Sequence, residues 1–164
     1  MGEGNTWIEE QYKQLFPGLA NDDFFKITSP QTTDYNCIAW AYNYNNRWME
    51  PPNGCQLPFD GITFWPDDVT PSSHPSALME LFARKGFIVC DSWEHEEGYQ
   101  KVALYYDPIT CEWTHAAREL TQKPNIGKWT SKLGTQNDIM HGTPYTIEGA
   151  TYGKVFCIMK REFK

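Results

Sequence analysis

The sequence predicts a segregated α+β domain, in which helices come first along the chain and a mostly antiparallel β-sheet follows. In the first half, apolar residues recur at helical spacing in residues 5–15 and 73–86. After Gly86 the pattern changes to short strand-like runs separated by turn residues. Because 164 residues can bury one sizeable core but are few for two, we expect a single domain over 1–164, with its core at about 24–161.

Three helices are expected, each with a recognisable start. The first covers residues 5–15 and begins at an asparagine, a good capping residue. The second begins at Cys37, where a polar, turn-rich stretch gives way to the apolar letters CIAWA, and Asp34 or Asn36 is its cap. The third lies within residues 73–86, with the serine at position 73 as its cap and a glycine as its stop.

The second half of the chain contains five strand-like runs. Their letters are FIVCD, YQKVALYYD, CEWTHAARE, GKWTSKLG and KVFCIMKR, and DPIT has the length of a hairpin connection. Simple alternation in the third run places Trp113, His115 and Ala117 on one face of the sheet. Residues 50–72 are rich in proline and glycine but also in aromatic residues, so we expect an ordered loop packed on the domain.

The charge of the chain excludes several classes of partner. With 14 Lys+Arg and 21 Asp+Glu the formal net charge is −7, which offers no field to attract nucleic acid or an anionic membrane surface. No apolar run approaches the roughly 20 residues that span a bilayer, and the first residues lack a signal pattern. We therefore expect a cytoplasmic protein, with export by a signal-independent secretion system as the other route.

The five cysteines indicate neither a disulfide framework nor a structural metal, because their number is odd and no C-x-x-C pair is present. We expect no cofactor and no metal. Cys90 and Cys157 lie in strand-like runs, where cysteine usually acts as a small hydrophobe. Cys37 differs, because the aligned backbone dipoles at the start of a helix favour the thiolate, which is the nucleophilic form.

A thiol nucleophile needs a base, and His115 is the candidate. It lies in a strand-like run between small neighbours that leave room beside the imidazole. His141 could form a metal pair with His115, but a zinc site would need a further ligand at short spacing, which is not evident.

Together these residues resemble the papain-like cysteine peptidase superfamily. Gln31 precedes Cys37 by six residues, as in the first motif of that family, although the Gly-Ser-Cys-Trp core is absent. His115 is followed by alanine, as in the second motif, and GKWTSKLG is similar to the next strand, with Ser131 at the position of the orienting asparagine. The resemblance implies a papain-like fold, in which N-terminal helices pack on the sheet.

The same resemblance implies a role for each residue. Gln31 would help to form the oxyanion hole, Cys37 would attack and His115 would exchange the proton. Ser131 would hold the imidazole, and Asp138 is its rival, because a carboxylate also stabilises the imidazolium.

Two further resemblances bear on the assignment. The order of the motifs is similar to that of the NlpC/P60 cell-wall amidases, but Lys101 occupies the position where those enzymes keep a catalytic histidine. The papain-type register is therefore preferred. More closely, blocks such as YNCIAWA and THAAREL resemble an uncharacterised bacterial family known only as a domain of unknown function, over roughly residues 30–161.

The leading hypothesis from the sequence is a cysteine-dependent hydrolase or transferase that acts on an amide bond as a peptidase, amidase or deamidase. Its substrate would be a protein, a peptide or a peptidoglycan peptide, and the size of the domain suits a bacterial effector or toxin. The alternative is a catalytically silent papain-like module that binds a partner protein.

Overall fold

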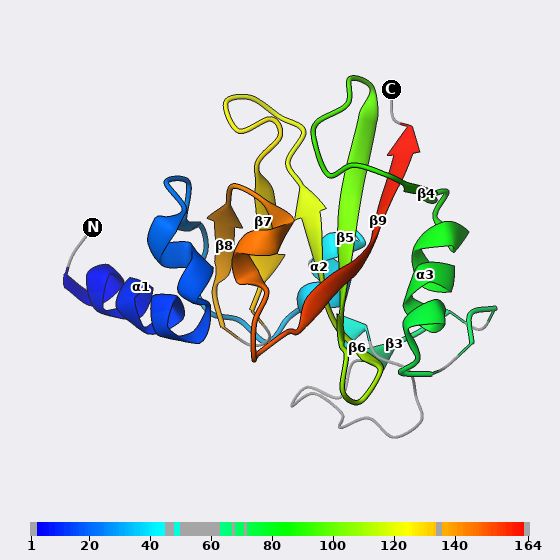
Figure 1. Ribbon diagram of the computed structural model, residues 1–164, viewed down its shortest axis with the longest axis horizontal. Coiled ribbons are helices and arrows are strands. Elements are labelled where there is room, and N and C mark those ends of the chain that lie inside the picture. Colours follow the sequence, from blue (N-terminus) through cyan, green and yellow to red (C-terminus); the bar gives the residue numbers. More distant parts are fainter. Residues whose placement is uncertain are drawn as a thin grey trace.

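The protein is an α+β structure built on one large antiparallel sheet (Figure 1). The computed structural model describes residues 3–44, 48–49, 63–66, 68–70, 72–133 and 136–162. Its helices are α1 (Glu3–Leu15), η1 (Pro17–Asn21), α2 (Cys37–Ala41), α3 (Pro75–Arg84) and η2 (Pro144–Ile147), where η denotes a 3-10 helix. The α+β class predicted from the sequence is confirmed.

The main sheet has seven strands in the order β1-β8-β7-β6-β5-β9-β4, and all its neighbouring strands are antiparallel. Their bounds are β1 (Lys26–Ile27), β4 (Ile88–Cys90), β5 (Tyr99–Asp107), β6 (Glu112–Glu119), β7 (Trp129–Lys132), β8 (Asp138–His141) and β9 (Lys154–Glu162). A separate parallel pair joins β2 (Trp48–Met49) to β3 (Thr63–Phe64). Most of the predicted loop 50–72 lies outside the described residues.

Most of the predicted elements are found, with differences at their ends. The helix that starts at Cys37 is present, and Asn36 is its cap, because the Asn36 side chain accepts a hydrogen bond from the Ala39 backbone N–H. The prediction of a serine cap for α3 was wrong. His74 caps this helix through Nδ1, which accepts a hydrogen bond from the Ser76 backbone N–H, while the Ser73 hydroxyl bonds Glu112.

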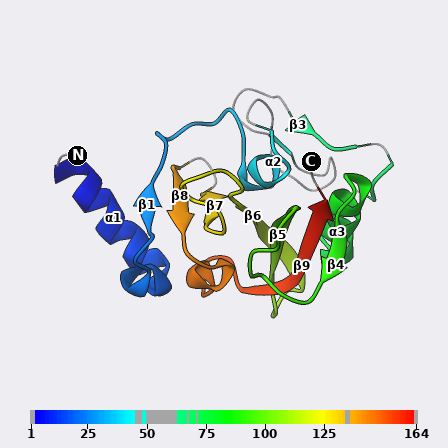
Figure 2. The same cartoon turned by 90° about the horizontal axis from the view of Figure 1, so that it is seen from above.

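Helices cover both faces of the sheet, and each face has its own apolar core (Figure 2). We call the first the α2 face, because α2 and α3 pack there on residues such as Val102, Leu104 and Ala116. We call the second the α1 face, because α1, η1 and η2 pack there on residues such as Tyr105 and Ala117. The helices are thus not gathered on one side of the sheet.

A β-bulge in β6 interrupts the alternation expected from the sequence. His115 pairs with Tyr105 and Trp113 pairs with Tyr106, so Thr114 between them is an extra residue without a partner in β5. As a result Trp113 packs on the α2 face, while the ring of His115 contacts Tyr105 on the α1 face. The prediction that Trp113 and His115 share a face was therefore wrong.

The turn before β9 depends on Gly153, which has a positive φ of 79°. A Cβ at this position would overlap the backbone carbonyl oxygen of Tyr106. We expect Gly153→Ala to lower the free energy of unfolding by more than about 2 kcal/mol, through steric overlap added to backbone strain. Urea denaturation followed by tryptophan fluorescence measures the change.

Gly98→Ala is the matched control. Gly98 has a similar φ of 85°, but no atom lies within 4 Å of an added Cβ. We expect this variant to lose only about 1 kcal/mol, the cost of the strained backbone alone. Equal losses in the two variants would show that the contact with Tyr106 is unimportant.

Candidate functional site

Cys37 is a core residue in the structure. It is the first residue of α2, but its side chain is only 9% exposed and belongs to the core of the α2 face. Burial raises the pKa of the thiol to about 11, although the backbone N–H groups around it and the charge of Lys132 act in the opposite direction. A helix of five residues supplies only a small dipole, so burial outweighs the effect that the sequence led us to expect.

His115 lies on the other side of the sheet. Its ring stacks on Tyr152, with the ring centroids 4.0 Å apart, and meets the edge of Tyr105 on the α1 face. The side chain is completely buried, and neither ring nitrogen has a hydrogen-bond partner among the described residues. Burial therefore holds the pKa of His115 well below its ordinary value, and the nearby His141 adds to this shift.

The structure does not bring Cys37 and His115 together as a nucleophile and its base. Cys37 packs against Ala116, whose side chain points to the α2 face, whereas the preceding residue of the same strand, His115, points to the α1 face. Among the described residues no hydrogen bond joins the thiol to any of the four histidines of the chain.

Ser131 does bind a histidine, but this histidine is His141. Ser131 Oγ lies 2.8 Å from His141 Nε2, and His141 Nδ1 lies 2.8 Å from the backbone carbonyl oxygen of Thr143. Because that carbonyl can only accept, Nδ1 carries the proton and the serine hydroxyl donates to Nε2. Ser131 and His141 are both completely buried, so this pair has no access to a substrate.

Asp138 and Gln31 are also distant from the predicted roles. Asp138 is the cross-strand partner of Lys132 and accepts a 2.7 Å hydrogen bond from the Tyr35 hydroxyl, so it does not orient His115. Burial raises the pKa of the Asp138 carboxyl. Gln31 is exposed, and its amide donates to the side-chain oxygen of Gln136 at 2.5 Å.

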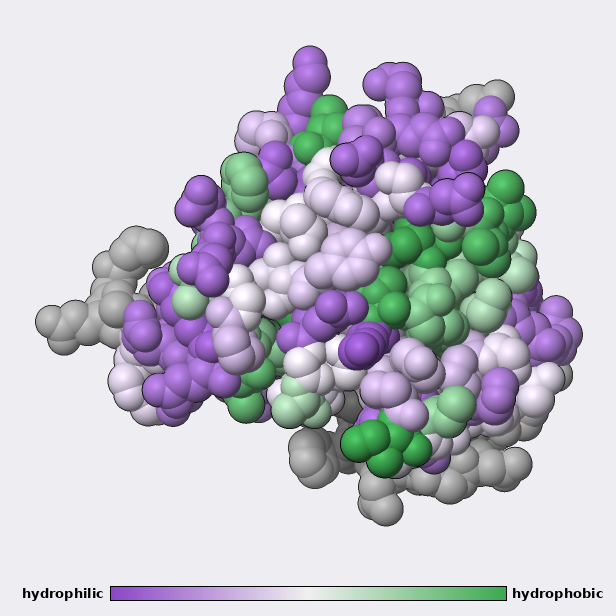
Figure 3. All heavy atoms as spheres, in the orientation of Figure 1, coloured by the Kyte–Doolittle hydropathy of each residue, from purple (hydrophilic) through white to green (hydrophobic). Residues whose placement is uncertain are grey.

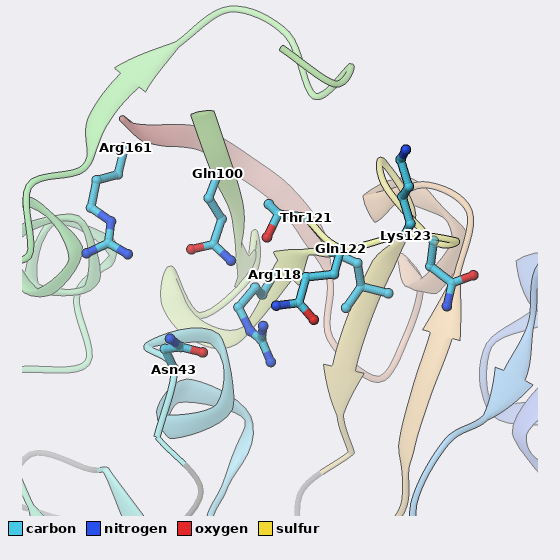
Figure 4. Close-up of a pocket in the computed structure, with 9 residues that line it drawn as sticks. Asn43, Gln100, Arg118, Thr121, Gln122, Lys123 and Arg161 are labelled. Atoms are coloured by element: carbon cyan, nitrogen blue, oxygen red, sulfur yellow. The ribbon is translucent and has the colours of Figure 1, made fainter. Parts of the chain in front are cut away.

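A different site is present at the end of the α2 face, where the chain forms a polar, half-open cavity of about 430 Å³ (Figure 4). The lining residues come from the end of α2, from β5, from β9, and from β6 and the loop that follows it; they are Asn43, Gln100, Arg118, Leu120, Thr121, Gln122, Lys123, Asn125 and Arg161. Leu120 is the one apolar side chain among them. In Figure 4 Gln100 and Arg161 extend from the sheet into the same space, and Asn43 lies opposite them.

Helix α2 positions one wall of this cavity through Arg118. The Arg118 guanidinium lies over the Trp40 ring, 4.5 Å from its centroid, and Nε donates to the Trp40 backbone carbonyl at 3.1 Å. Trp40 is itself held from two sides, because its indole N–H donates to Thr130 and its ring stacks on Tyr35. The CIAWA segment, interpreted from the sequence as a nucleophile motif, here acts as a support for an arginine.

Arg118 and Arg161 were not expected as site residues, although the sequence contains a pattern that indicates them. Both lie in strand-like runs at positions that alternate with apolar residues, Arg118 two residues after Ala116 and Arg161 two residues after Met159. A charged residue on an otherwise apolar strand face indicates a polar site at the end of that face.

Residues 26–160 match the family described as Domain of unknown function (DUF7689), and the chain belongs to this family. Comparison with curated proteins and with solved structures gives no match. In the part of the chain that the structure describes, no helix is long and apolar enough to cross a membrane.

The burial of Cys37 predicts slow alkylation. We expect iodoacetamide at pH 7.5 to modify the exposed Cys111 first and Cys37 at least about a hundredfold more slowly, because a buried thiol with a raised pKa is almost never a thiolate. Peptide mass spectrometry over time measures both rates. Faster labelling of Cys37 than of Cys111 would restore it as a nucleophile candidate.

The two buried histidines predict a loss of stability in acid. Burial lowers the pKa of His141 to about 4. The unfolded chain therefore binds a proton at this residue near pH 6.5, whereas the folded chain binds it only near pH 4. Stability from this residue is therefore complete above pH 6.5 and is lost as the pH falls toward 4. We expect His141 alone to lower the free energy of unfolding by about 2 kcal/mol between pH 7 and pH 5, measured by urea denaturation.

His115 acts in the same direction, so His115→Leu should make stability less sensitive to acid than in the wild type. His74→Asn is the control, because it removes an exposed imidazole but keeps a side chain that can cap α3. If His115→Leu and wild type lose the same stability between pH 7 and pH 5, folding does not lower the pKa of His115.

Proposed function

We propose that this domain is a small-ligand binding module, that its ligand site is the polar cavity, and that Cys37 is a structural residue. The observation that carries the proposal is the state of Arg161. Its side chain lines the cavity, and within the described residues it forms no ion pair. A cation without a carboxylate partner at a cavity wall attracts a negatively charged or polar group, and a ligand in the cavity would supply that group.

The size of the cavity and the origin of its walls support the same function. A volume of about 430 Å³ falls in the range of small-molecule sites. Its walls come from strands as well as loops, and strands hold side chains more rigidly than loops do. A rigid, polar, preformed cavity lowers the entropy cost of ordering side chains around a ligand.

The papain-like cysteine hydrolase remains a second candidate, because α2 does begin at Cys37 and its cap, Asn36, is the residue type that such a helix prefers. In this alternative the thiol would need a base on the α2 face. The burial of Cys37 and the position of His115 support the binding module instead, which is the non-catalytic alternative already raised by the sequence.

The proposal predicts that a bulky side chain in the cavity abolishes ligand binding. We expect saturation-transfer NMR of pooled neutral, anionic and cationic polar metabolites to detect binders of the wild type that Thr121→Trp no longer binds. Cys37→Ser should keep these binders, because a serine in the core leaves the cavity unchanged.

Ala150→Trp is the matched control, since it places the same side chain in an exposed loop outside the cavity. Circular dichroism shows whether each variant is folded. Binders that Thr121→Trp retains would contradict the assignment of the site to the cavity.

A further inference from the structure

Three polar side chains from adjacent strands converge on the cavity. Arg161 of β9 is the cross-strand partner of Gln100 in β5, and Arg118 of β6 pairs with Val102, two residues further along β5. All three strand positions belong to the α2 face. Since neighbouring strands are about 4.8 Å apart and two residues extend about 6.7 Å along a strand, the two arginines start from backbones roughly 12 Å apart, with Gln100 on the strand between them.

The protein neutralises the positive charge of this region only in part, because the Asp138 carboxylate acts on Arg118 without forming an ion pair with it. Within the described residues neither Arg118 nor Arg161 forms an ion pair, and no Asp or Glu lines the cavity. The positive charges of the two arginines also affect the neighbouring Lys85. Burial, together with the charges of Arg161 and Arg118, lowers its pKa to about 8.

This concentration of cations occurs in a chain whose net charge is −7. Elsewhere several cations do have carboxylate partners, as Arg84 has Asp68 at 2.6 Å and Lys160 has Glu96 at 2.9 Å. Two half-buried guanidinium groups without an ion-paired carboxylate leave positive charge that a bound anion would offset.

The remaining lining residues indicate what the anion is attached to. Asn43, Thr121, Gln122 and Asn125 present amides and a hydroxyl, which can both donate and accept hydrogen bonds and therefore match alcohol groups. Among the described residues none of the lining side chains is aromatic, so they offer no surface on which a nucleotide base could stack. A small, hydroxylated, hydrophilic molecule fits these walls.

We propose that the cavity binds a phosphate monoester of a polyhydroxylated compound, with the phosphate held by Arg161 and Arg118 and the hydroxyl groups held by the amides and Thr121. This inference rests on the proposed binding function and adds the chemical class of the ligand. A phosphate monoester carries nearly two negative charges at neutral pH and matches the planar fork of arginine. Two arginines suit this charge better than that of a single carboxylate.

Isothermal titration calorimetry with four probes tests the class: glucose 6-phosphate, inorganic phosphate, glucose and succinate. We expect glucose 6-phosphate to bind at least about tenfold more tightly than inorganic phosphate, because only the ester also uses the amides and Thr121. Glucose alone should not bind measurably. Vesicles containing phosphatidylinositol 4-phosphate distinguish a lipid headgroup from a free sugar phosphate as the source of the same chemistry.

Variants locate the binding. Arg161→Gln should weaken glucose 6-phosphate binding about tenfold or more, whereas Arg84→Gln, which removes the same charge from an ion pair outside the cavity, should change it less than about twofold. Thr121→Val should weaken the ester but not inorganic phosphate. Arg118→Lys keeps a positive charge next to Trp40 but loses the planar fork of the guanidinium group. It therefore tests the role of Arg118 while a cation still lies over the Trp40 ring.

The outcomes separate the two proposals. Tighter binding of succinate than of glucose 6-phosphate, or equal binding of glucose and its phosphate, would overturn the phosphate ester while leaving a ligand site in the cavity. Phosphate ester binding that is unchanged by Arg161→Gln and Arg118→Lys would overturn it as well. If no probe binds and the pooled metabolites also give no cavity binder, both proposals fail.

Discussion

The contact between Arg118 and Trp40 connects the short helix α2 to the sheet, and the geometry of the cavity depends on it. Five residues cannot form a stable helix alone, because the cost of starting a helix is recovered only over several turns. Packing on the sheet stabilises α2, and the Arg118 guanidinium fixes the carbonyl at its Trp40 end. In return the helix holds a long, flexible cation in one orientation at the cavity wall. An arginine so positioned loses little entropy when it binds an anion.

Much of the fold could be predicted from local patterns, since β5 and β6 alternate or run apolar over many residues and α1 and α3 have clear helical spacing. The short strands β1 and β8 could not, because two to four residues carry no period and become strands only through pairing with each other and with β7. The start of α2 was predictable from Asn36. What covers Cys37 was not, because burial is decided by residues far away in the sequence.

In the candidate site, too, some features could be predicted from the sequence and others could not. Ser131 was expected to hold a histidine, and it does, but the partner is His141 on the adjacent strand β8. The order of the papain-type motifs assigned Ser131 to His115, although His141 is nearer in the sequence, because strand β8 was not predicted. Local spacing therefore identified a residue with the correct chemistry and the wrong partner. Arg118 and Arg161 lie 43 positions apart in the sequence. They line the same cavity only because β6 and β9 both pair with β5 in the sheet.

The bulge at Thr114 divides β6 into two segments, and odd-numbered and even-numbered residues exchange faces of the sheet between them. Beyond it, even-numbered residues such as Ala116 and Arg118 face α2; before it, the odd-numbered Trp113 does. The bulged residue is also anchored, because the Thr114 hydroxyl donates to the backbone carbonyl of Tyr152, whose ring covers His115. A one-residue insertion or deletion at Thr114 would therefore change the face on which Trp113 lies, while Arg118 would stay on the face that lines the cavity.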